Sequence, residues 1–210
     1  MAIQFDASSG SNNTTSSSIS FSHTCTGNRR LLIAAVFVRD AASNPVTAIT
    51  YNSVAMTKIE DNVVGTQTFQ LYGLYAPSTG SNTLAVTLSA THNALAVAAC
   101  SYIGVKQGEV YDVKNEYTAA SGTSKTLSVT TTVNACWTLF AIQSTGGAGS
   151  AGANSFQRKT QSVVGIYDSN GDRGVAGSKS MTVSSLSGEQ NGVIISMAPA
   201  IVTGAFIVDG

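Results

Sequence analysis

Charged residues are scarce in this 210-residue sequence. Lys, Arg, Asp and Glu make up 10% of it, with eleven basic residues, eleven acidic residues and no formal net charge at pH 7. An ordinary globular chain has about 25% charged residues. A chain without net charge has no long-range field that attracts a polyanion or an anionic membrane. We therefore expect no nucleic-acid partner and no membrane partner, and an exterior of hydroxyl and amide groups.

Long apolar runs and a secretory leader are also absent from the sequence. No apolar run approaches the roughly 18 residues that a membrane-spanning helix needs. The opening MAIQFDASSG has neither the basic start nor the apolar stretch of a leader. These features predict a soluble protein that is made in a cytoplasm.

Cysteines are few: Cys25, Cys100 and Cys136. They are too widely spaced for a disulfide framework, and an odd number leaves at least one of them unpaired. Cys100 and Cys136 lie inside apolar runs, where a free cysteine behaves as a small buried apolar residue. We predict buried free thiols.

What the sequence has instead is a series of strand patterns, roughly every 8 to 15 residues, with turn residues between them. Two segments alternate between apolar and polar residues, as strands with one solvated face do. Other runs are apolar on both faces and predict central strands; for 94–100, periodicity alone leaves a helix as the alternative. The alternating segments are 17–24 and 83–89, and the fully apolar runs are 31–38, 94–100, 136–142 and 193–198.

Helical periodicity is absent, and no linker divides the chain. A chain of this length can bury roughly 70% of the surface that it exposes when unfolded, so one large core is sufficient. We predict an all-β protein, a two-sheet antiparallel β-sandwich that forms a single domain over residues 1–210. Asn44-Pro45 and the segment 77–80 predict turns at strand ends, and Asn170-Gly171 predicts a two-residue hairpin.

The stretch GGAGSAGAN at 146–154 contains a formal G-x-G-x-x-G motif directly after a strand-like run. In a dinucleotide-binding fold, the glycines of this motif lead into a helix whose N-terminus holds the pyrophosphate. The residues that follow here, NSFQRKTQSVVGIY, form a polar strand-like pattern. We interpret the stretch as a loop between strands, or one that becomes ordered against a neighbouring subunit, and predict no cofactor.

Two weak metal-site patterns occur. Asp168, Asn170 and Asp172 have the alternate spacing of a calcium loop, but Arg173 stands where an EF-hand has glycine and position 12 is not glutamate. The interpretations of this segment are a plain turn or a structural calcium site. His23 and Cys25 lack the second pair that a tetrahedral zinc site needs. We predict no bound metal.

No catalytic set can be recognised, and we predict no catalytic residues. His23 and His92 are the two histidines, and no nucleophile motif accompanies them. We interpret His23, on the same strand face as the apolar residues of its segment, as a core or edge residue. The carboxylates fall mostly at loops or strand ends, so a glycosidase pair cannot be diagnosed.

Aromatic residues offer a few candidates for exposed contacts. Trp137 lies in an apolar run and is interpreted as a core residue, although tryptophan can also stack on sugars. Tyr111, Tyr117 and Tyr167 lie nearer to loops and are the better candidates for exposed aromatic contacts.

Four motifs occur in order over residues 17–107: FSHTCTGNRRLLIAAVFV, VTAITYNSVAMTKIE, LYGLYAPSTGSNTLAVTLSA and ALAVAACSYIGVKQ. Together they resemble a β-sandwich family that is common among bacteriophage structural proteins and bacterial surface proteins. Beyond residue 107, only the final apolar strand, NGVIISMAP, is similar in position and character. Ser53 departs from the pattern, because glycine is more usual there. The resemblance implies a jelly-roll-like or immunoglobulin-like module on a particle or cell surface.

The resemblance and the lack of a leader imply a non-enzymatic bacteriophage virion protein, either a capsid decoration protein or a tail or fibre component. Such a protein would be made in the host cytoplasm and would contact other virion proteins or its own copies, most simply as a homo-oligomer. The alternative is a carbohydrate-binding or adhesin module that binds a surface glycan through loop tyrosines and Asn or Asp side chains. An enzyme that acts on a polysaccharide is a third hypothesis.

Overall fold

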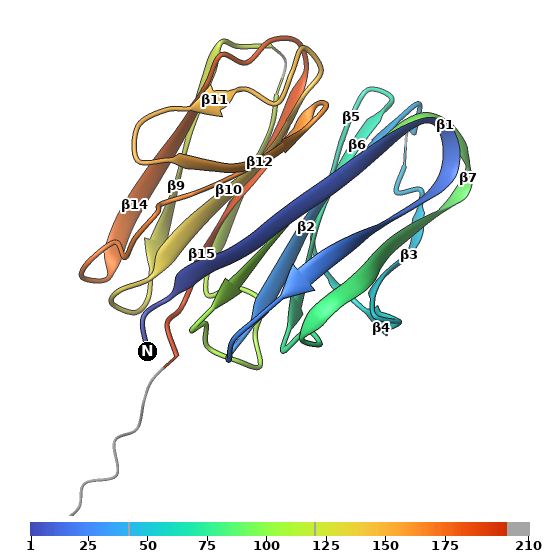
Figure 1. Cartoon of the computed structure of the whole chain (residues 1–210). Coiled ribbons are helices and arrows are strands. Elements are labelled where there is room, and N and C mark those ends of the chain that lie inside the picture. The colour runs from blue at the N-terminus through green and yellow to red at the C-terminus, as the bar shows by residue number, and fades with distance from the viewer. Residues whose placement is uncertain (42, 120, 201–210) are drawn as a thin grey trace, which may run out of the picture.

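The computed structural model describes residues 1–41, 43–119 and 121–200, and their regular structure is antiparallel β-strand (Figure 1). The predicted all-β antiparallel sandwich is therefore confirmed. The strands are β1 (Gln4–Cys25), β2 (Leu31–Arg39), β3 (Val46–Tyr51), β4 (Val54–Ala55), β5 (Thr57–Val64), β6 (Gln67–Tyr75), β7 (Gly80–Ile103), β8 (Lys114–Ala119), β9 (Ser124–Thr131), β10 (Trp137–Ser144), β11 (Ser150–Ala151), β12 (Phe156–Gln161), β13 (Val164–Asp168), β14 (Gly177–Ser184) and β15 (Gln190–Met197).

The long strands β1 and β7 bend, so that each takes part in two layers (Figure 1). Residues 94–103 of β7 pair with β2 and with the first part of β1, whereas residues 80–88 pair with β3 and with the second part of β1. A register shift between Ser16 and Ser18 marks the bend in β1. The seven-stranded sheet thus provides an inner sheet, β1-β7-β2-β6-β5, and an outer sheet, β1-β7-β3-β4.

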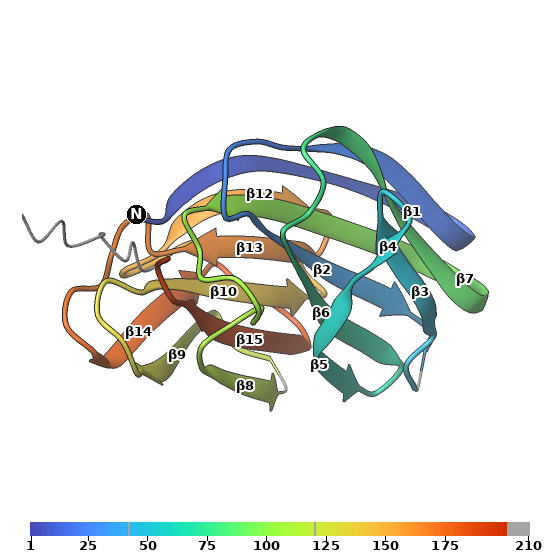
Figure 2. The same cartoon turned by 90° about the horizontal axis from the view of Figure 1, so that it is seen from below.

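The C-terminal strands form a second inner sheet, β12-β13-β10-β15-β8, and a second outer sheet, β11-β14-β9. Figure 2 shows the strands of this second inner sheet in their order from β12 at the top to β8 at the bottom. Side-chain direction fixes the order of the layers. Along β2, Ile33 points into a central cluster between the inner sheets, and its neighbour Leu32 points toward the N-terminal outer sheet. Along β10, Leu139 points into the same central cluster, and Phe140 points toward the C-terminal outer sheet.

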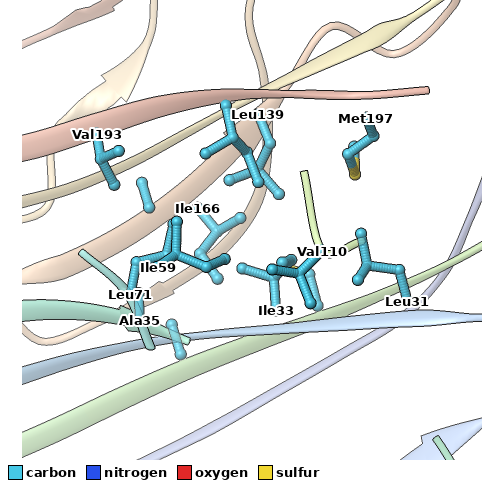
Figure 3. Close-up of a cluster of buried hydrophobic side chains, with 14 of the residues drawn as sticks. Leu31, Ile33, Ala35, Ile59, Leu71, Val110, Leu139, Ile166, Val193 and Met197 are labelled. Carbon is cyan, nitrogen blue, oxygen red and sulfur yellow. The ribbon is translucent and has the colours of Figure 1, made fainter. Parts of the chain in front are cut away.

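The central strands of the inner sheets are consequently buried on both faces, which explains why β2, β10, β13 and β15 are apolar at most positions. The four predicted central strands are β2, the second part of β7, β10 and β15, so that prediction is confirmed and the helix alternative for 94–100 is wrong. Figure 3 shows the central cluster, where Leu31 and Ile33 from one inner sheet face Leu139 and Met197 from the other.

The two halves of the chain, β1–β7 and β8–β15, have the same strand order. With the two parts of β1 and of β7 counted separately and the two-residue strand β4 left out of the count, the first strand of each half pairs with the last, the second with the seventh and the third with the sixth. This nested pairing is typical of a jelly roll. In both halves the fifth strand pairs with the sixth and extends the inner sheet.

The two inner sheets also pack against each other reciprocally. β1 lies against β12 and β5 against β8; β7 lies against β13 and β6 against β15; β2 crosses β10. β1 and β8 are the first strands of their halves, and β5 and β12 are the fifth. The contact of β1 with β12 is therefore the same contact as that of β8 with β5, with the two halves exchanged. Such reciprocity defines a two-fold, isologous interface. The two halves are therefore related by a pseudo-two-fold axis.

One local prediction is wrong. Asn170-Gly171 does not close a hairpin, because β13 pairs within the inner sheet and β14 within the outer sheet. The segment crosses between layers instead. In the part of the chain that the structure describes, no helix is long and apolar enough to cross a membrane. The single domain over residues 1–210 stays a prediction, and residues 201–210 lie outside the described part.

Candidate functional site

Arg158 is the centre of an ion-pair and aromatic cluster at one end of the inner sheets. Its Nε donates to Asp168 Oδ2 over 2.6 Å, and the two side chains are 10% and 0% exposed. Its guanidinium carbon lies 4.4 Å from the ring centre of Phe5 and 4.5 Å from that of Phe156. An arginine can stack on aromatic faces and pair with a carboxylate at the same time. The cluster joins the two halves, since Phe5 belongs to β1 and the other residues to β12 and β13.

Asp168 was one of the three oxygen donors of the candidate calcium loop. Its second oxygen accepts the backbone N–H of Asn170, and Asn170 Oδ1 accepts a hydrogen bond from Arg158 over 2.7 Å. Asp172 turns away and accepts the backbone N–H of Gly174. Arg158 thus holds the place that a cation would take. No group of three or more His, Cys, Asp or Glu side chains that could hold a metal occurs in the described residues.

An open groove of about 370 Å³ lies in the other half of the molecule. Its rim carries two tyrosines, Tyr75, which is 45% exposed, and Tyr111, which is half-buried. Glu109 contributes a carboxylate, which pairs with the exposed Lys106 over 3.0 Å. The groove is lined by Thr57, Tyr75, Gly108, Glu109, Val110, Tyr111 and Asp112.

Asp112, at the edge of this groove, is held by hydrogen bonds. The hydroxyl and backbone N–H of Thr132 both donate to it, and Ser196 Oγ donates over 3.1 Å. Burial by itself raises the pKa of Asp112, but the bonds from Thr132 and Ser196 outweigh it and hold the pKa below its ordinary value. The carboxylate is therefore ionised at neutral pH.

The N-terminal half contains the same arrangement around Asp6. Thr26 donates its backbone N–H over 2.9 Å and its hydroxyl over 2.5 Å, and Ser101 Oγ donates over 2.8 Å. The balance is also the same, since burial raises the pKa of Asp6 and the bonds from Thr26 and Ser101 bring it below its ordinary value. In each half the aspartate lies 20 residues before its threonine. The two clusters tie the start of the first strand, in the case of Asp6, or the residues just before it, in the case of Asp112, to the loop that follows the second strand.

His23 and the cysteines lie in the protein interior. His23 is 1% exposed, its Nδ1 lies 2.7 Å from Ser9 Oγ, and its ring meets Tyr51 edge-on at 6.2 Å. Burial lowers the pKa of His23 to about 4, so it is neutral at pH 7. His92 lies in an exposed contact with the Asp40 carbonyl, far along the sequence from His23. The predicted buried free thiols are confirmed for all three cysteines.

The aromatic candidates divide in two. Trp137 is a core residue as predicted, in the central cluster. The prediction for Tyr117 and Tyr167 is wrong: both are buried under the C-terminal outer sheet. Both side chains point from the inner sheet toward the C-terminal outer sheet and are buried between the two sheets. Tyr111 is the predicted tyrosine that does lie at a groove.

The glycine-rich stretch connects β10 to β12 and includes the short strand β11, which pairs with β14. Its backbone N–H groups are engaged: Gly146 donates to the Ser187 carbonyl and Gly152 to the Thr182 carbonyl. The stretch is followed by β12, where a dinucleotide-binding motif requires a helix.

A pair of carboxylates meets at the seam between β5 and β8. Lys114 Nζ donates to Glu60 Oε2 over 2.6 Å and to the Ile59 carbonyl over 3.1 Å. The hydrogen bond with Glu60 raises the pKa of Glu116, and burial adds to the rise. For Glu60, burial raises the pKa, but bonds with Glu116 and Lys114 lower it overall. The pair sits on the seam rather than in the groove, and it joins the halves at the edge of the inner sheets.

Comparisons with known proteins do not assign the chain to a family. No family model matches the chain, and no curated protein matches it. Among solved structures, the major capsid protein P2 from bacteriophage PM2 aligns over 95% of this chain and 100% of its own, with 8% sequence identity and a TM-score of 0.26. At this TM-score and identity, the likeness carries no argument about the function of the chain.

Proposed function

We propose that this chain is a non-enzymatic structural protein of a bacteriophage virion, which acts through contacts with other virion proteins or with its own copies. The observation that carries the proposal is the chemistry of the two outer sheets. Along β1, β7, β9 and β14 the outward residues are small, uncharged and mostly hydroxyl side chains, on both ends of the layered molecule.

The C-terminal outer face has this character throughout β9 and β14. In these strands every second residue points outward, and each outward residue opposes another hydroxyl residue across the strands. Thr126 and Thr182 illustrate the contact, with their hydroxyl oxygens 2.8 Å apart. The outward pairs are Ser124 with Ser184, Thr126 with Thr182, Ser128 with Ser180, and Thr130 with Ser178.

The N-terminal outer face repeats the pattern on β1 and β7. Its outward pairs are Ser18 with Thr87, Ser20 with Ala85, Ser22 with Thr83, and Thr24 with Ser81. Flat hydroxyl faces of this kind can lie against a neighbouring protein without the cost of desolvating charges. They suit a protein that is surrounded by neighbours in an assembly, as does a net charge of zero.

The sequence resemblance over residues 17–107 supports the bacteriophage setting, because those motifs are similar to a family of virion and surface proteins. The jelly-roll strand order of both halves agrees with that family's fold. A role as head decoration or as a tail or fibre component is the finer form of the proposal. Synthesis in a host cytoplasm and assembly as a homo-oligomer belong to it as well.

The carbohydrate-binding alternative loses much of its support from the positions of the tyrosines. Tyr117 and Tyr167 lie in the core, where they cannot stack on a sugar. Tyr111 remains at the rim of a groove, and glycan binding there is an outcome that the experiment on that groove below can detect.

Quantitative mass spectrometry of purified virions tests the proposal. We expect the chain in intact, gradient-purified particles at a fixed number of copies per particle. Hundreds of copies would indicate head decoration, and three to about a dozen would indicate a tail or vertex location, because homo-oligomers follow the symmetry of their attachment site. Absence of the chain from infectious particles would overturn the proposal.

A further inference from the structure

The open groove and the Arg158 cluster occupy the same place in the two halves. Thr57 and Phe156 are the first residues of the fifth strand in each half, and they pair with Gly73 and Asp168 respectively. One residue later in each strand, the register shifts in the same way, between 58 and 60 and between 157 and 159. The residue at this shift is Ile59 in one half and Arg158 in the other.

The remaining walls correspond as well. Tyr111 immediately precedes Asp112, as Phe5 immediately precedes Asp6, and the two aspartates hold the matching hydrogen-bond clusters. Tyr75 stands two residues after Gly73, as Asn170 stands two residues after Asp168. The groove is therefore the counterpart of the space that the Arg158 guanidinium fills.

Side-chain length explains why one space is filled and the other is open. Arg158 extends past the core and places its guanidinium between two aromatic rings. Ile59 is too short to do this and ends in the central cluster, where it is 5% exposed. Gly73 has no side chain to supply the carboxylate of Asp168, and Val110 packs in the place of one.

We propose that this groove is a binding site for an arginine side chain of a partner polypeptide. In the bound state the guanidinium lies against Tyr111, as that of Arg158 lies against Phe5. Tyr75 lines the groove at the place of Asn170, which binds Arg158 in the other half. Thr57 stands at the place of Phe156. Arg158 of the C-terminal half thus shows which side chain fits the equivalent groove of the N-terminal half.

The charges at the groove suit a cation. The groove is lined by two carboxylates, Glu109 and Asp112. Asp112 keeps its negative charge because its hydrogen bonds come from neutral groups. Glu109 pairs with Lys106 in a contact whose side chains are 63% and 53% exposed. An exposed pair of this kind is weak, so an incoming guanidinium can replace the lysine.

NMR titration of the isotope-labelled full chain tests the site with N-acetyl-arginine amide as the probe. We expect saturable shifts of the backbone signals at Thr57, Tyr75 and residues 108–112. The matched control is N-acetyl-citrulline amide, which has the same shape without the charge. We expect its affinity to be at least about ten-fold lower, because charge stabilises binding to aromatic faces and carboxylates.

Two variants sharpen the test. Tyr111→Ala removes one aromatic wall and should weaken arginine binding about ten-fold. Thr57→Arg adds an arginine at an exposed position on the rim, and we expect it to fill the groove and abolish binding of the probe. Thr126→Ala, on the C-terminal outer face and six residues before Thr132 in the sequence, should bind the probe as the unchanged chain does.

The proposal does not depend on the virion role, because the titration measures binding directly and mass spectrometry of particles measures location. Three results would overturn it: no saturable shifts with arginine, equal shifts with citrulline, or shifts of the same residues by neutral oligosaccharides in place of arginine.

Discussion

The two halves of the molecule share one architecture but differ in what they bury. Around Asp6 and Asp112 they are nearly identical, with a threonine and a serine bonded to the carboxylate in each. At the fifth strand they diverge, since Arg158 in one half corresponds to Ile59 in the other. The comparison separates what the fold requires from what it tolerates. Closing the first strand onto the neighbouring loop is required, whereas the end of the fifth strand is free to change.

A second difference lies under the outer sheets. In the N-terminal half His23 points into the cluster beneath its outer sheet, with Cα partner Asn82 on β7. The corresponding place in the C-terminal half is held by Val129, which is paired with Lys179 on β14. One core is therefore entirely apolar at this position, and the other holds a titratable ring. The halves should respond differently to acid for this reason.

The largest expected effect comes from breaking the ion pair that only one half has. Asp168→Ala leaves the Arg158 guanidinium buried without its carboxylate, and we expect the free energy of unfolding to fall by about 3–5 kcal/mol. Urea denaturation followed by Trp137 fluorescence measures the loss. The double variant Arg158→Met with Asp168→Leu removes both charges, as the equivalent positions Ile59 and Gly73 carry none, and should cost much less. An equal cost in both variants would show that the charge pair is not what distinguishes this site.

The next largest effect is the acid sensitivity of the N-terminal half. The pKa of His23 falls from 6.5 to about 4 on folding because burial opposes its charged form. Between these two values the unfolded chain binds a proton that the folded chain does not, so acidification favours unfolding in this window. We expect a loss of about 3 kcal/mol between pH 6.5 and pH 4, measured by urea denaturation at several pH values.

His23→Val copies the residue of the C-terminal half and provides the control. In this variant the loss of stability between pH 6.5 and pH 4 should largely disappear, at a small cost at pH 7 from the lost contact with Ser9. A pH profile unchanged by the substitution would mean that the ring is protonated in the folded protein or that another group causes the loss.

Substituting either of the two equivalent aspartates should lower the free energy of unfolding by the same amount. Asp6→Asn and Asp112→Asn each weaken hydrogen bonds to a charged acceptor, and we expect each to cost about 1.5–3 kcal/mol at pH 7. The two values should agree within about 0.5 kcal/mol, because the partners are the same in the two halves. Chemical denaturation of both variants at one pH measures this, and a difference above about 1 kcal/mol would contradict the equivalence of the clusters.

Acid should abolish the difference between these variants and the unchanged chain. Both aspartates have a folded pKa below the unfolded value near 3.8. Their contribution to stability is therefore complete above that value and is lost as the pH falls through the folded pKa. Below this range the carboxylates are protonated in the folded chain as well, so Asp6→Asn should cost little there.

The sequence pattern was sufficient to predict the strands and the sandwich. A strand buried on one face alternates between apolar and polar residues, and a strand buried on both faces is a continuous apolar run. The repeat of the two halves left a weaker trace. Thr26 and Asn28 correspond to Thr132 and Asn134, each pair shortly before an inner strand. Most other positions differ, since a β-layer requires apolar character rather than particular residues. The groove could not be predicted, because it depends on the spatial equivalence of Ile59 with Arg158, which only the strand register reveals.

The smallest expected effect concerns the turn between β3 and β4. Asn52 and Ser53 both have positive φ, 49° and 64°. A two-residue hairpin of this type favours glycine at its second position, because glycine has no Cβ to oppose positive φ. Ser53→Gly should therefore stabilise the protein by about 0.5–1 kcal/mol, as a rise in melting temperature of a few degrees.

The C-terminal half contains the same dipeptide, Asn154-Ser155, after β11. Here we expect substitution of the serine by glycine to destabilise the protein. Asn154 has a positive φ of 57°, but Ser155 does not share it. Its hydroxyl also accepts the Gly152 N–H and donates to the Thr182 carbonyl over 2.7 Å. Ser155→Gly loses these bonds and gains no relief of strain, so it should lower the melting temperature. If both substitutions shift it in the same direction, backbone conformation is not what separates the two turns.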